Sequence, residues 1–375
     1  MTAYESAPEN VNANASWVHG GADALGAARF DFSTNSNACG PCPAALAAVQ
    51  AADATHYPDP AYTALRQRLA AFHGVDSERV LLAGSASEFI FRISAWAQQQ
   101  GVHRVQLPAH HYGDYARAAQ AWGLQPVNNR AEPTPVAAGT DALHWACEPS
   151  SPLGQAHVGW PTWLTRLTPL ASAADESAES VQAVGLIVLD AAYAPLRLSG
   201  TPSLRQAQLD QVWQLFTPNK ALGLTGVRAA YVIAPSIKNT WARGQIDAIK
   251  SLNLLAPSWP LGAHGEALLH AWASPPVQAW LAQCLPTLRH WKARQMTLLQ
   301  NLGWQLQPSE ANYFCAKPPQ PLDLAALRAA HGIKLRDCAS FGLPGWLRLG
   351  VLGPQAQAAL AQALASLSQP VGVSI

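Results

Sequence analysis

Two basic residues, Lys220 and Arg228, flank a short glycine-containing loop in the middle of the chain. Residues 216–231 read F-T-P-N-K-A-L-G-L-T-G-V-R-A-A-Y, with an apolar run before the lysine and another around the end of the segment. A lysine at the end of a buried strand is costly to desolvate unless its amine has a partner or a reaction, and forming a Schiff base with an aldehyde is such a reaction. Gly223 and Gly226 permit the tight backbone that brings Arg228 toward the same cavity. Without the flanking sequence pattern, Lys220 would be interpreted as a solvated loop lysine.

An aspartate, Asp190, ends the continuous apolar run V-G-L-I-V-L-D-A-A-Y at residues 184–193. Such a run is typical of a parallel strand that is covered on both faces, and ligands bind at the carboxyl ends of such strands. An unpaired buried carboxylate costs several kcal/mol, so Asp190 needs a cationic partner.

A small-residue turn, G-S-A-S-E, follows the short apolar run at residues 79–83 and opens an apolar helix that we expect to reach Gln99. A strand, a small-residue turn and a helix together present free backbone N–H groups and the positive end of a helix dipole to an anion. Many helices begin with a serine and a capping glutamate, so this turn is a weak signal by itself.

These segments together resemble fold-type I enzymes that use pyridoxal 5′-phosphate (PLP), whose lysine segment has the form S-x-[ST]-K-x-x-G-L-x-G-x-R-x-G-Y. The resemblance implies that Lys220 holds the cofactor aldehyde, Arg228 its phosphate and Asp190 its protonated pyridine nitrogen. Tyr112, in P-A-H-H-Y-G-D-Y, corresponds to the aromatic residue that stacks on the ring. Tyr115, in the same segment, is assigned to core packing. Further cofactor contacts are expected from Ser85, Ala86, Tyr193 and Thr217.

Two other segments match the same enzymes, one of them with a departure. The segment P-S-S-P-L-G at residues 149–154 corresponds to N-P-N-N-P-T-G and places Ser151 where the family has the asparagine that contacts the phenolic oxygen of the cofactor. A serine hydroxyl is shorter, so this contact is in doubt. Tyr57, in Y-P-D-P, corresponds to a tyrosine that reaches the cofactor phosphate of the partner subunit. The resemblance therefore implies a homodimer with shared active sites.

The substrate contacts come from both ends of the chain. His19, in H-G-G, and Asn35, in F-D-F-S-T-N-S-N, resemble the start of the threonine-phosphate decarboxylases of the cobalamin pathway. Arg336, in R-D-C-x-x-F, and Arg348 resemble the substrate arginines shared by these decarboxylases and the histidinol-phosphate aminotransferases. Guanidinium groups suit phosphate and carboxylate alike. We expect decarboxylation of L-threonine O-3-phosphate, with amino transfer on a phosphorylated amino acid such as histidinol phosphate as the alternative.

A third alternative is a non-catalytic relative or a redox module that uses Cys39-Gly40-Pro41-Cys42. A thioredoxin-like dithiol follows a strand in a small domain, whereas N-S-N-A precedes this pair in a chain of 375 residues, so we expect no redox role. The formal net charge of +1 gives no basic excess for nucleic acid. The polar N-terminal residues lack the regions of a signal peptide, and no apolar run approaches the roughly 20 residues that cross a bilayer. We expect a cytoplasmic enzyme without a metal site.

The expected architecture is α/β, with the aspartate aminotransferase fold: a large, mostly parallel sheet domain and a small α/β domain. The expected division is residues 1–45 for an N-terminal arm and part of the small domain, 46–258 for the large domain and 259–375 for the rest of the small domain. Helices are predicted at residues 43–52, 61–72, 275–302, 323–331 and 355–367, and strands at 79–83 and 103–107. Residues 1–15, 128–141 and 171–182 are polar or low in complexity and predict disorder or loops.

Overall fold

The computed structural model describes residues 19–128, 142–165, 186–236 and 242–367. The expected disorder at residues 1–15 and the expected loops at 129–141 and 171–182 lie outside these ranges. Within them, no helix is both long and apolar enough to cross a membrane.

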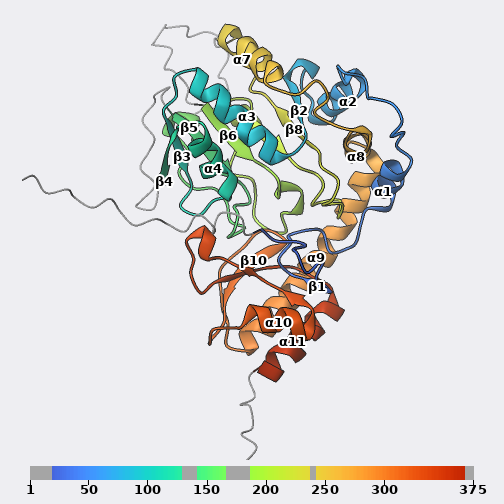
Figure 1. Cartoon of the computed structure of the whole chain (residues 1–375), viewed down its shortest axis with the longest axis vertical. Coiled ribbons are helices and arrows are strands. Elements are labelled where there is room, and N and C mark those ends of the chain that lie inside the picture. Colours follow the sequence, from blue (N-terminus) through green and yellow to red (C-terminus); the bar gives the residue numbers. More distant parts are fainter. Residues whose placement is uncertain (1–18, 129–141, 166–185, 237–241, 368–375) are drawn as a thin grey trace, which may run out of the picture.

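A seven-stranded sheet forms the larger part of the molecule, with strand order β2-β8-β7-β6-β5-β3-β4 (Figure 1). Only β8 runs antiparallel to its neighbours, β2 and β7, and the other pairs are parallel, which confirms the mostly parallel sheet. The strands are β2 (Val80–Ala83), β3 (Arg104–Leu107), β4 (Gln125–Asn128), β5 (Ala142–Cys147), β6 (Leu186–Asp190), β7 (Trp213–Phe216) and β8 (Ala230–Ile233).

Helices cover both faces of this sheet, so successive strand residues enter different cores. Leu81 and Ala83 pack with α3 (Ala86–Gln99), α4 (Gly113–Ala121) and α7 (Ala242–Leu254). Val80 and Leu82 pack on the other face with α1 (Pro43–Gln50), α2 (Thr63–His73) and α8 (Ala263–Trp272). Burial on both faces explains why the strands are continuously apolar rather than alternating. Two short helices, α5 (Thr162–Thr165) and α6 (Gln206–Leu209), complete this part.

The smaller part contains a four-stranded antiparallel sheet of order β12-β13-β10-β9 and a two-stranded parallel pair, β1 with β11. Phe30 of β1 pairs with Ile333 of β11, so residues far apart in the sequence lie side by side here. The elements are β1 (Phe30–Asp31), β9 (Gln305–Leu306), β10 (Tyr313–Lys317), α10 (Leu324–His331), β11 (Ile333–Lys334), β12 (Arg336–Asp337), β13 (Leu347–Gly350) and α11 (Pro354–Leu367).

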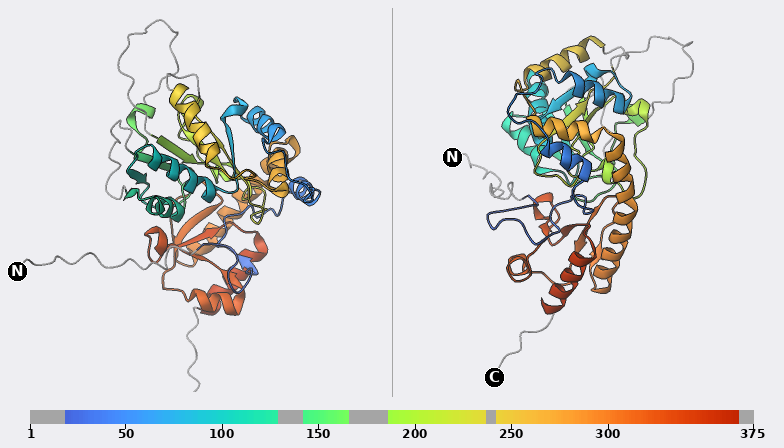
Figure 2. Two further views of the ribbon diagram at one scale, coloured as in Figure 1. Left: turned by 45° about the horizontal axis from the view of Figure 1, so that its top comes forward. Right: turned by 90° about the vertical axis from the view of Figure 1, so that its right-hand side faces the viewer.

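One long helix, α9 (Pro275–Asn301), runs along both parts, as the right-hand view of Figure 2 shows. Its buried face includes Val277 and Leu281 near the start and Leu299 near the end. This helix confirms the predicted interdomain helix at 275–302. All strands of the large sheet lie between Val80 and Ile233, and all other strands lie outside that range. A domain division at residues 45 and 258 is consistent with this arrangement and remains our proposal.

Candidate active site

A cavity of about 640 Å³ lies between the two parts of the molecule and brings together every predicted site residue except Tyr57. We name two regions of its wall. The sheet side consists of Ser85, Asp190, Thr217, Lys220 and Arg228, which lie at the ends of strands of the large sheet or in the loops next to them. The arginine side consists of Asn35, Arg336, Phe341 and Arg348. The remaining predicted residues in the lining are His19, Ala86, Tyr112, Ser151 and Tyr193.

Lys220 lies in the loop after β7, and its Nζ atom is 5.3 Å from the centre of the Tyr193 ring. The lysine loop is held by the N-terminal part of the chain, because the backbone N–H of Asn37 donates to the Lys220 carbonyl (2.9 Å) and that of Cys42 donates to the Leu222 carbonyl (2.8 Å). Gly223 has a φ of +69°, and a Cβ atom there would lie 2.6 Å from the Gly40 carbonyl oxygen. Only glycine permits this close approach.

The Cys39–Cys42 turn therefore has a structural explanation: it is the backbone surface on which the lysine loop rests. Burial raises the pKa of the Cys39 thiol to about 12, which keeps it protonated at neutral pH. Cys42 is fully buried. Neither property suits a reactive dithiol.

Asp190 ends β6 and is buried, with two hydrogen bonds to its carboxylate. Its Oδ2 atom accepts from the Tyr115 hydroxyl (2.6 Å), and its Oδ1 atom accepts from the backbone N–H of Ala192 (2.9 Å). Burial raises the pKa of Asp190, while these hydrogen bonds and the nearby Lys220 amine act in the opposite direction. A cation placed beside this carboxylate would further favour its charged form.

Tyr115 has a role that the sequence interpretation missed. It is fully buried and its ring stacks on Trp145 with 4.3 Å between centroids, so the predicted packing is confirmed. Its hydroxyl also contacts Asp190, so the assignment to packing alone was wrong. The spacing of three residues between Tyr112 and Tyr115 was the available signal, since such residues lie on one face of a helix.

The first turn of α3 and Thr217 form a place for an anion. Ser85 caps α3 by accepting from the Glu88 backbone N–H (3.0 Å), which leaves the N–H groups at the helix start, including that of Ala86, directed outward. Thr217 Oγ1 is buried and has no hydrogen-bond partner among the described residues. The exposed Arg228 side chain lines the same cavity. A phosphate group fits this set of donors.

Tyr112 is the N-cap residue of α4 and lines the cavity next to α3. Its hydroxyl lies 3.2 Å from Ser87 Oγ. Burial raises the pKa of Tyr112, so the side chain is a neutral phenol at physiological pH. A neutral aromatic ring beside Asp190 and Lys220 can stack on an electron-poor ring.

Arg336 and Arg348 lie directly opposite each other on the antiparallel strands β12 and β13, and both are buried. Arg348 donates to Ser151 Oγ (3.3 Å) and to the Ser33 carbonyl (3.1 Å), while Arg336 donates to Ser340 Oγ (2.8 Å). Like charges directly opposite each other destabilise a sheet. Burial and the neighbouring Arg348 lower the pKa of Arg336. This side of the cavity is suited to one or more anions.

Ser151 thus contacts an arginine. Its hydroxyl is oriented by Arg348, 197 residues further along the chain. The predicted contact to a cofactor oxygen stays a proposal.

His19, Gly20 and Gly21 also line the cavity. A Cβ atom at Gly20 would overlap the Ser33 carbonyl, so the glycine is what allows this segment to pack against the loop after β1. The His19 ring centroid lies 6.1 Å from that of Tyr112. Asn35 Nδ2 donates to the Tyr193 hydroxyl (3.2 Å). Both predicted substrate residues therefore lie at the cavity, next to its aromatic wall.

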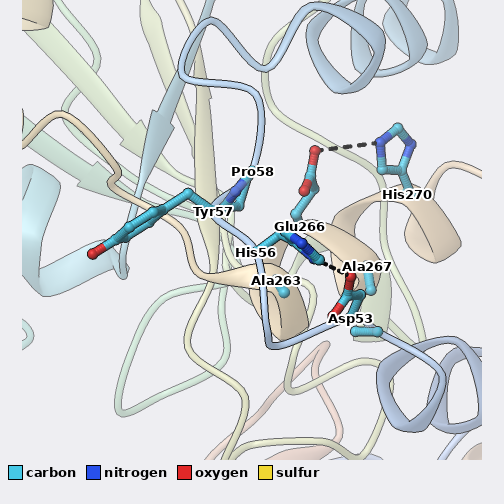
Figure 3. Close-up of a pocket in the computed structure, with 9 residues that line it drawn as sticks. Asp53, His56, Tyr57, Pro58, Ala263, Glu266, Ala267 and His270 are labelled. Carbon is cyan, nitrogen blue, oxygen red and sulfur yellow. Dashed lines mark hydrogen bonds and ion pairs between the residues drawn. The ribbon is translucent and has the colours of Figure 1, made fainter.

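Tyr57 lies elsewhere. It lines a separate cavity of about 400 Å³ together with His56, Pro58 and residues of α8 (Figure 3). Its side chain is 79% exposed and stacks on Trp259 with 4.5 Å between centroids. Within one chain it does not reach the cavity that holds Lys220, and its action on a partner subunit stays a prediction.

The described residues fit PLP. Lys220 would hold the aldehyde, Asp190 the pyridine nitrogen and Tyr112 one face of the ring. Thr217, Arg228 and the start of α3 would hold the phosphate, and the partnerless Thr217 Oγ1 would gain a hydrogen bond. When bound, this cofactor accepts the electron pair of a bond broken at the α-carbon of an amino-acid substrate.

Comparison with known proteins gives a family. The family model of class I and II aminotransferases matches residues 28–152 and 178–366. The chain is 28% identical over 360 residues to the histidinol-phosphate aminotransferase of Jannaschia sp. (strain CCS1), covering 94% of each chain.

Two solved structures have a similar fold. The L-threonine-O-3-phosphate decarboxylase of Porphyromonas gingivalis has a TM-score of 0.69 at 18% identity, covering 90% of this chain and 98% of that one. The histidinol-phosphate aminotransferase of Sinorhizobium meliloti, solved in complex with PLP, has a TM-score of 0.67 at 18% identity, covering 89% and 90%. Both likenesses support the expected fold.

Proposed function

Because the chain belongs to the class I and II aminotransferase family, we propose that it is a PLP-dependent enzyme acting on a small phosphorylated amino acid. The observation that carries the proposed substrate class is the pair of buried guanidinium groups, Arg336 and Arg348, in the same cavity as Lys220. Two buried cations in register call for anionic groups on the substrate.

In this proposal each side of the cavity has one task. On the sheet side, Lys220 holds the cofactor and its Nζ atom moves the proton at the α-carbon of the substrate. Asp190, fixed by Tyr115, keeps a proton on the ring nitrogen. On the arginine side, Arg336 and Arg348 bind the anionic groups of the substrate and thereby set which bond at the α-carbon stands perpendicular to the ring. That orientation determines the reaction.

Amino transfer from histidinol phosphate to a 2-oxo acid has the better support from the comparisons. The relative from Jannaschia sp. is named a histidinol-phosphate aminotransferase, and the match covers 94% of each chain. Amino transfer, which was the alternative in the sequence analysis, is therefore better supported by the comparisons than decarboxylation, which was the first choice. In this reaction Lys220 removes the α-hydrogen of the substrate.

Decarboxylation of L-threonine O-3-phosphate is the second candidate, and one feature of the cavity favours it. This substrate carries a carboxylate and a phosphate at once, which matches two buried guanidinium groups, whereas histidinol phosphate carries only the phosphate. The N-terminal H-G-G segment, which resembles that of the decarboxylases, also lines the cavity. In this reaction the substrate carboxylate is lost and Lys220 supplies a proton to the α-carbon.

The two reactions are separated by their need for a second substrate. Amino transfer from histidinol phosphate requires 2-oxoglutarate and stalls after the first half-reaction without it. Decarboxylation of L-threonine O-3-phosphate releases carbon dioxide continuously without any 2-oxo acid. Purified holoenzyme is given each substrate with and without 2-oxoglutarate, and carbon dioxide and glutamate are measured. If neither substrate is consumed, the proposed substrate class is wrong.

The homodimer with shared sites and the cytoplasmic location remain predictions. Tyr57→Phe tests the first of these. If Tyr57 contacts the partner's cofactor phosphate, the variant should bind PLP more weakly by about 1 kcal/mol, or up to about 3 kcal/mol for a bond to a charged group. A fully active monomer in sedimentation experiments would contradict the shared site.

A further inference from the structure

The ring of Phe341 lies beneath both arginines of the arginine side. The Cζ atom of Arg336 is 4.8 Å from the ring centroid, and that of Arg348 is 5.5 Å from it. The hydrogen bonds described above for the two arginines go to different parts of the chain. Arg336 donates to Ser340, four residues away, whereas Arg348 donates to Ser33 and Ser151. Because Phe341 contacts both, displacing it disturbs both guanidinium groups together.

Phe341 belongs to a compact turn at residues 338–343. Its backbone N–H donates to the Cys338 carbonyl (2.9 Å), and the N–H of Leu343 donates to the same carbonyl (3.1 Å). These bonds use the amide groups of the turn and leave the Phe341 carbonyl available to a partner outside it. A partner on that carbonyl can therefore hold the turn against the larger part of the molecule.

Its partner is His110, in the loop between β3 and α4, at a distance of 2.7 Å from Nδ1 to the carbonyl oxygen. A carbonyl oxygen only accepts, so Nδ1 carries the proton. His110 is two residues before Tyr112, which lines the cavity, but His110 itself lines a neighbouring cavity of about 310 Å³. This hydrogen bond therefore joins the loop that carries Tyr112 to the turn beneath the two arginines.

We propose that His110 is a positioning residue that holds the arginine side in place from the opposite part of the molecule, through the Phe341 carbonyl. The inference rests on the proposed function only for the identity of the anions that the arginines bind. His110 lines the neighbouring cavity and is not among the residues assigned to the cofactor, so its loss should affect the positions of the guanidinium groups more than it affects cofactor binding.

Three substitutions of His110 test the geometry. The amide nitrogen of asparagine occupies nearly the position of Nδ1, whereas that of glutamine extends to the position of Nε2. His110→Asn should therefore keep the hydrogen bond, while His110→Gln and His110→Ala should lose it. The matched control is His103→Ala, an exposed histidine just before β3.

The first measurement needs no substrate. Hydrogen–deuterium exchange of the holoenzyme should be faster at residues 338–346 in His110→Ala and His110→Gln than in the wild type. His110→Asn and His103→Ala should match the wild type. Unchanged exchange in His110→Ala, or equal exchange in the Asn and Gln variants, would overturn the proposal whatever the enzyme acts on.

The second measurement uses L-threonine O-3-phosphate or histidinol phosphate, whichever is turned over. KM should rise about tenfold in the Ala and Gln variants, as expected for one lost hydrogen bond. The kcat value and the PLP dissociation constant should stay within about twofold. A loss confined to kcat or to PLP affinity would overturn the positioning role. If neither compound is turned over, the proposed function fails, whereas the exchange experiment still decides the role of His110.

Discussion

The two sides of the cavity bury charges of opposite sign. The sheet side buries one carboxylate, Asp190, and stabilises it with a tyrosine hydroxyl and a backbone amide. The arginine side buries two guanidinium groups next to each other and gives them hydroxyl and carbonyl oxygens as partners. Asp190 is therefore suited to a cationic partner and the arginine side to anions, in a single cavity that spans both parts of the molecule.

The sides also differ in how their residues are positioned. On the sheet side, each group lies at or near the end of a strand or at the start of a helix of the larger part, and the lysine loop is also held by the backbone N–H groups of Asn37 and Cys42. On the arginine side, the groups depend on cross-strand register and on contacts with Ser33 and Ser151, far away in the sequence. A substitution on the sheet side should impair cofactor binding or its chemistry, and a substitution on the arginine side should impair substrate binding alone. The four predictions below test this separation.

The largest effect is expected at Lys220. Lys220→Ala should remove the visible absorbance of the bound cofactor and lower turnover by about 10⁴-fold or more, since the variant lacks the amine that holds the aldehyde and moves the proton. Circular dichroism should show a folded protein. Borohydride reduction of the wild type should label Lys220, and labelling of Lys250, an exposed lysine on α7, would refute the assignment.

The next effect is expected on the arginine side. Arg336→Ala and Arg348→Ala should each raise KM for the phosphorylated substrate by about 10- to 100-fold, as expected for a lost charge-assisted hydrogen bond. The PLP dissociation constant should change little. Steady-state kinetics and a cofactor titration measure the two quantities in the same preparations. An equal loss of both affinities would mean that the two sides do not act separately.

A smaller effect is expected on the stability of the apoprotein through Asp190. Burial raises its folded pKa above the unfolded value, so the folded state holds this proton more tightly. Wild-type stability should therefore fall as the pH rises through the folded pKa, with the full penalty above it. Asp190→Asn removes this titration. The variant should equal the wild type in stability at acidic pH and be the more stable of the two at neutral pH.

Urea denaturation of both apoproteins at several pH values measures this difference. The same substitution should lower turnover of the holoenzyme, because the ring nitrogen loses its anionic partner. A stability difference that does not vary with pH would show that Asp190 carries no burial penalty.

No effect is expected from the thiols of the Cys39–Cys42 turn. Replacing both cysteines by serine should leave kcat/KM unchanged. The turn supports the lysine loop through the Cys42 backbone N–H and the close approach of Gly40 to Gly223, and these backbone contacts do not involve the thiol groups. Assays with and without a reducing agent are the measurement. Activity that is lost in the double variant, and that reductant restores in the oxidised wild type, would revive the redox alternative.

The sequence signals for the sheet side are local, and the structure brings the residues that carry them together in one cavity. An apolar run that ends in Asp190 or leads to Lys220 is visible in a short window, and so is the turn that begins α3. The spacing of Tyr112 and Tyr115 indicated only that they share a helix face, and the partner of the Tyr115 hydroxyl, Asp190, lies 75 residues away. The register that places Arg336 opposite Arg348, and the contact of Ser151 with Arg348, depend on how the small sheet forms and docks. Tyr57 was predicted from resemblance alone, and its predicted contact, the cofactor phosphate, belongs to a partner subunit.

The lysine loop also has a consequence for the order of events during biosynthesis. The amide of Asn37 that binds the Ala221 carbonyl is made 184 residues before it, and the N–H groups of Asn37 and Cys42 bind the same loop. The ribosome therefore releases Asn37 and Cys42, which support the lysine loop, long before it releases Lys220. The loop can form these contacts only after β7 and Lys220 have been synthesised. Correct placement of the Lys220 amine thus requires that residues 37–42 and the loop after β7, which are far apart in the sequence, have come together.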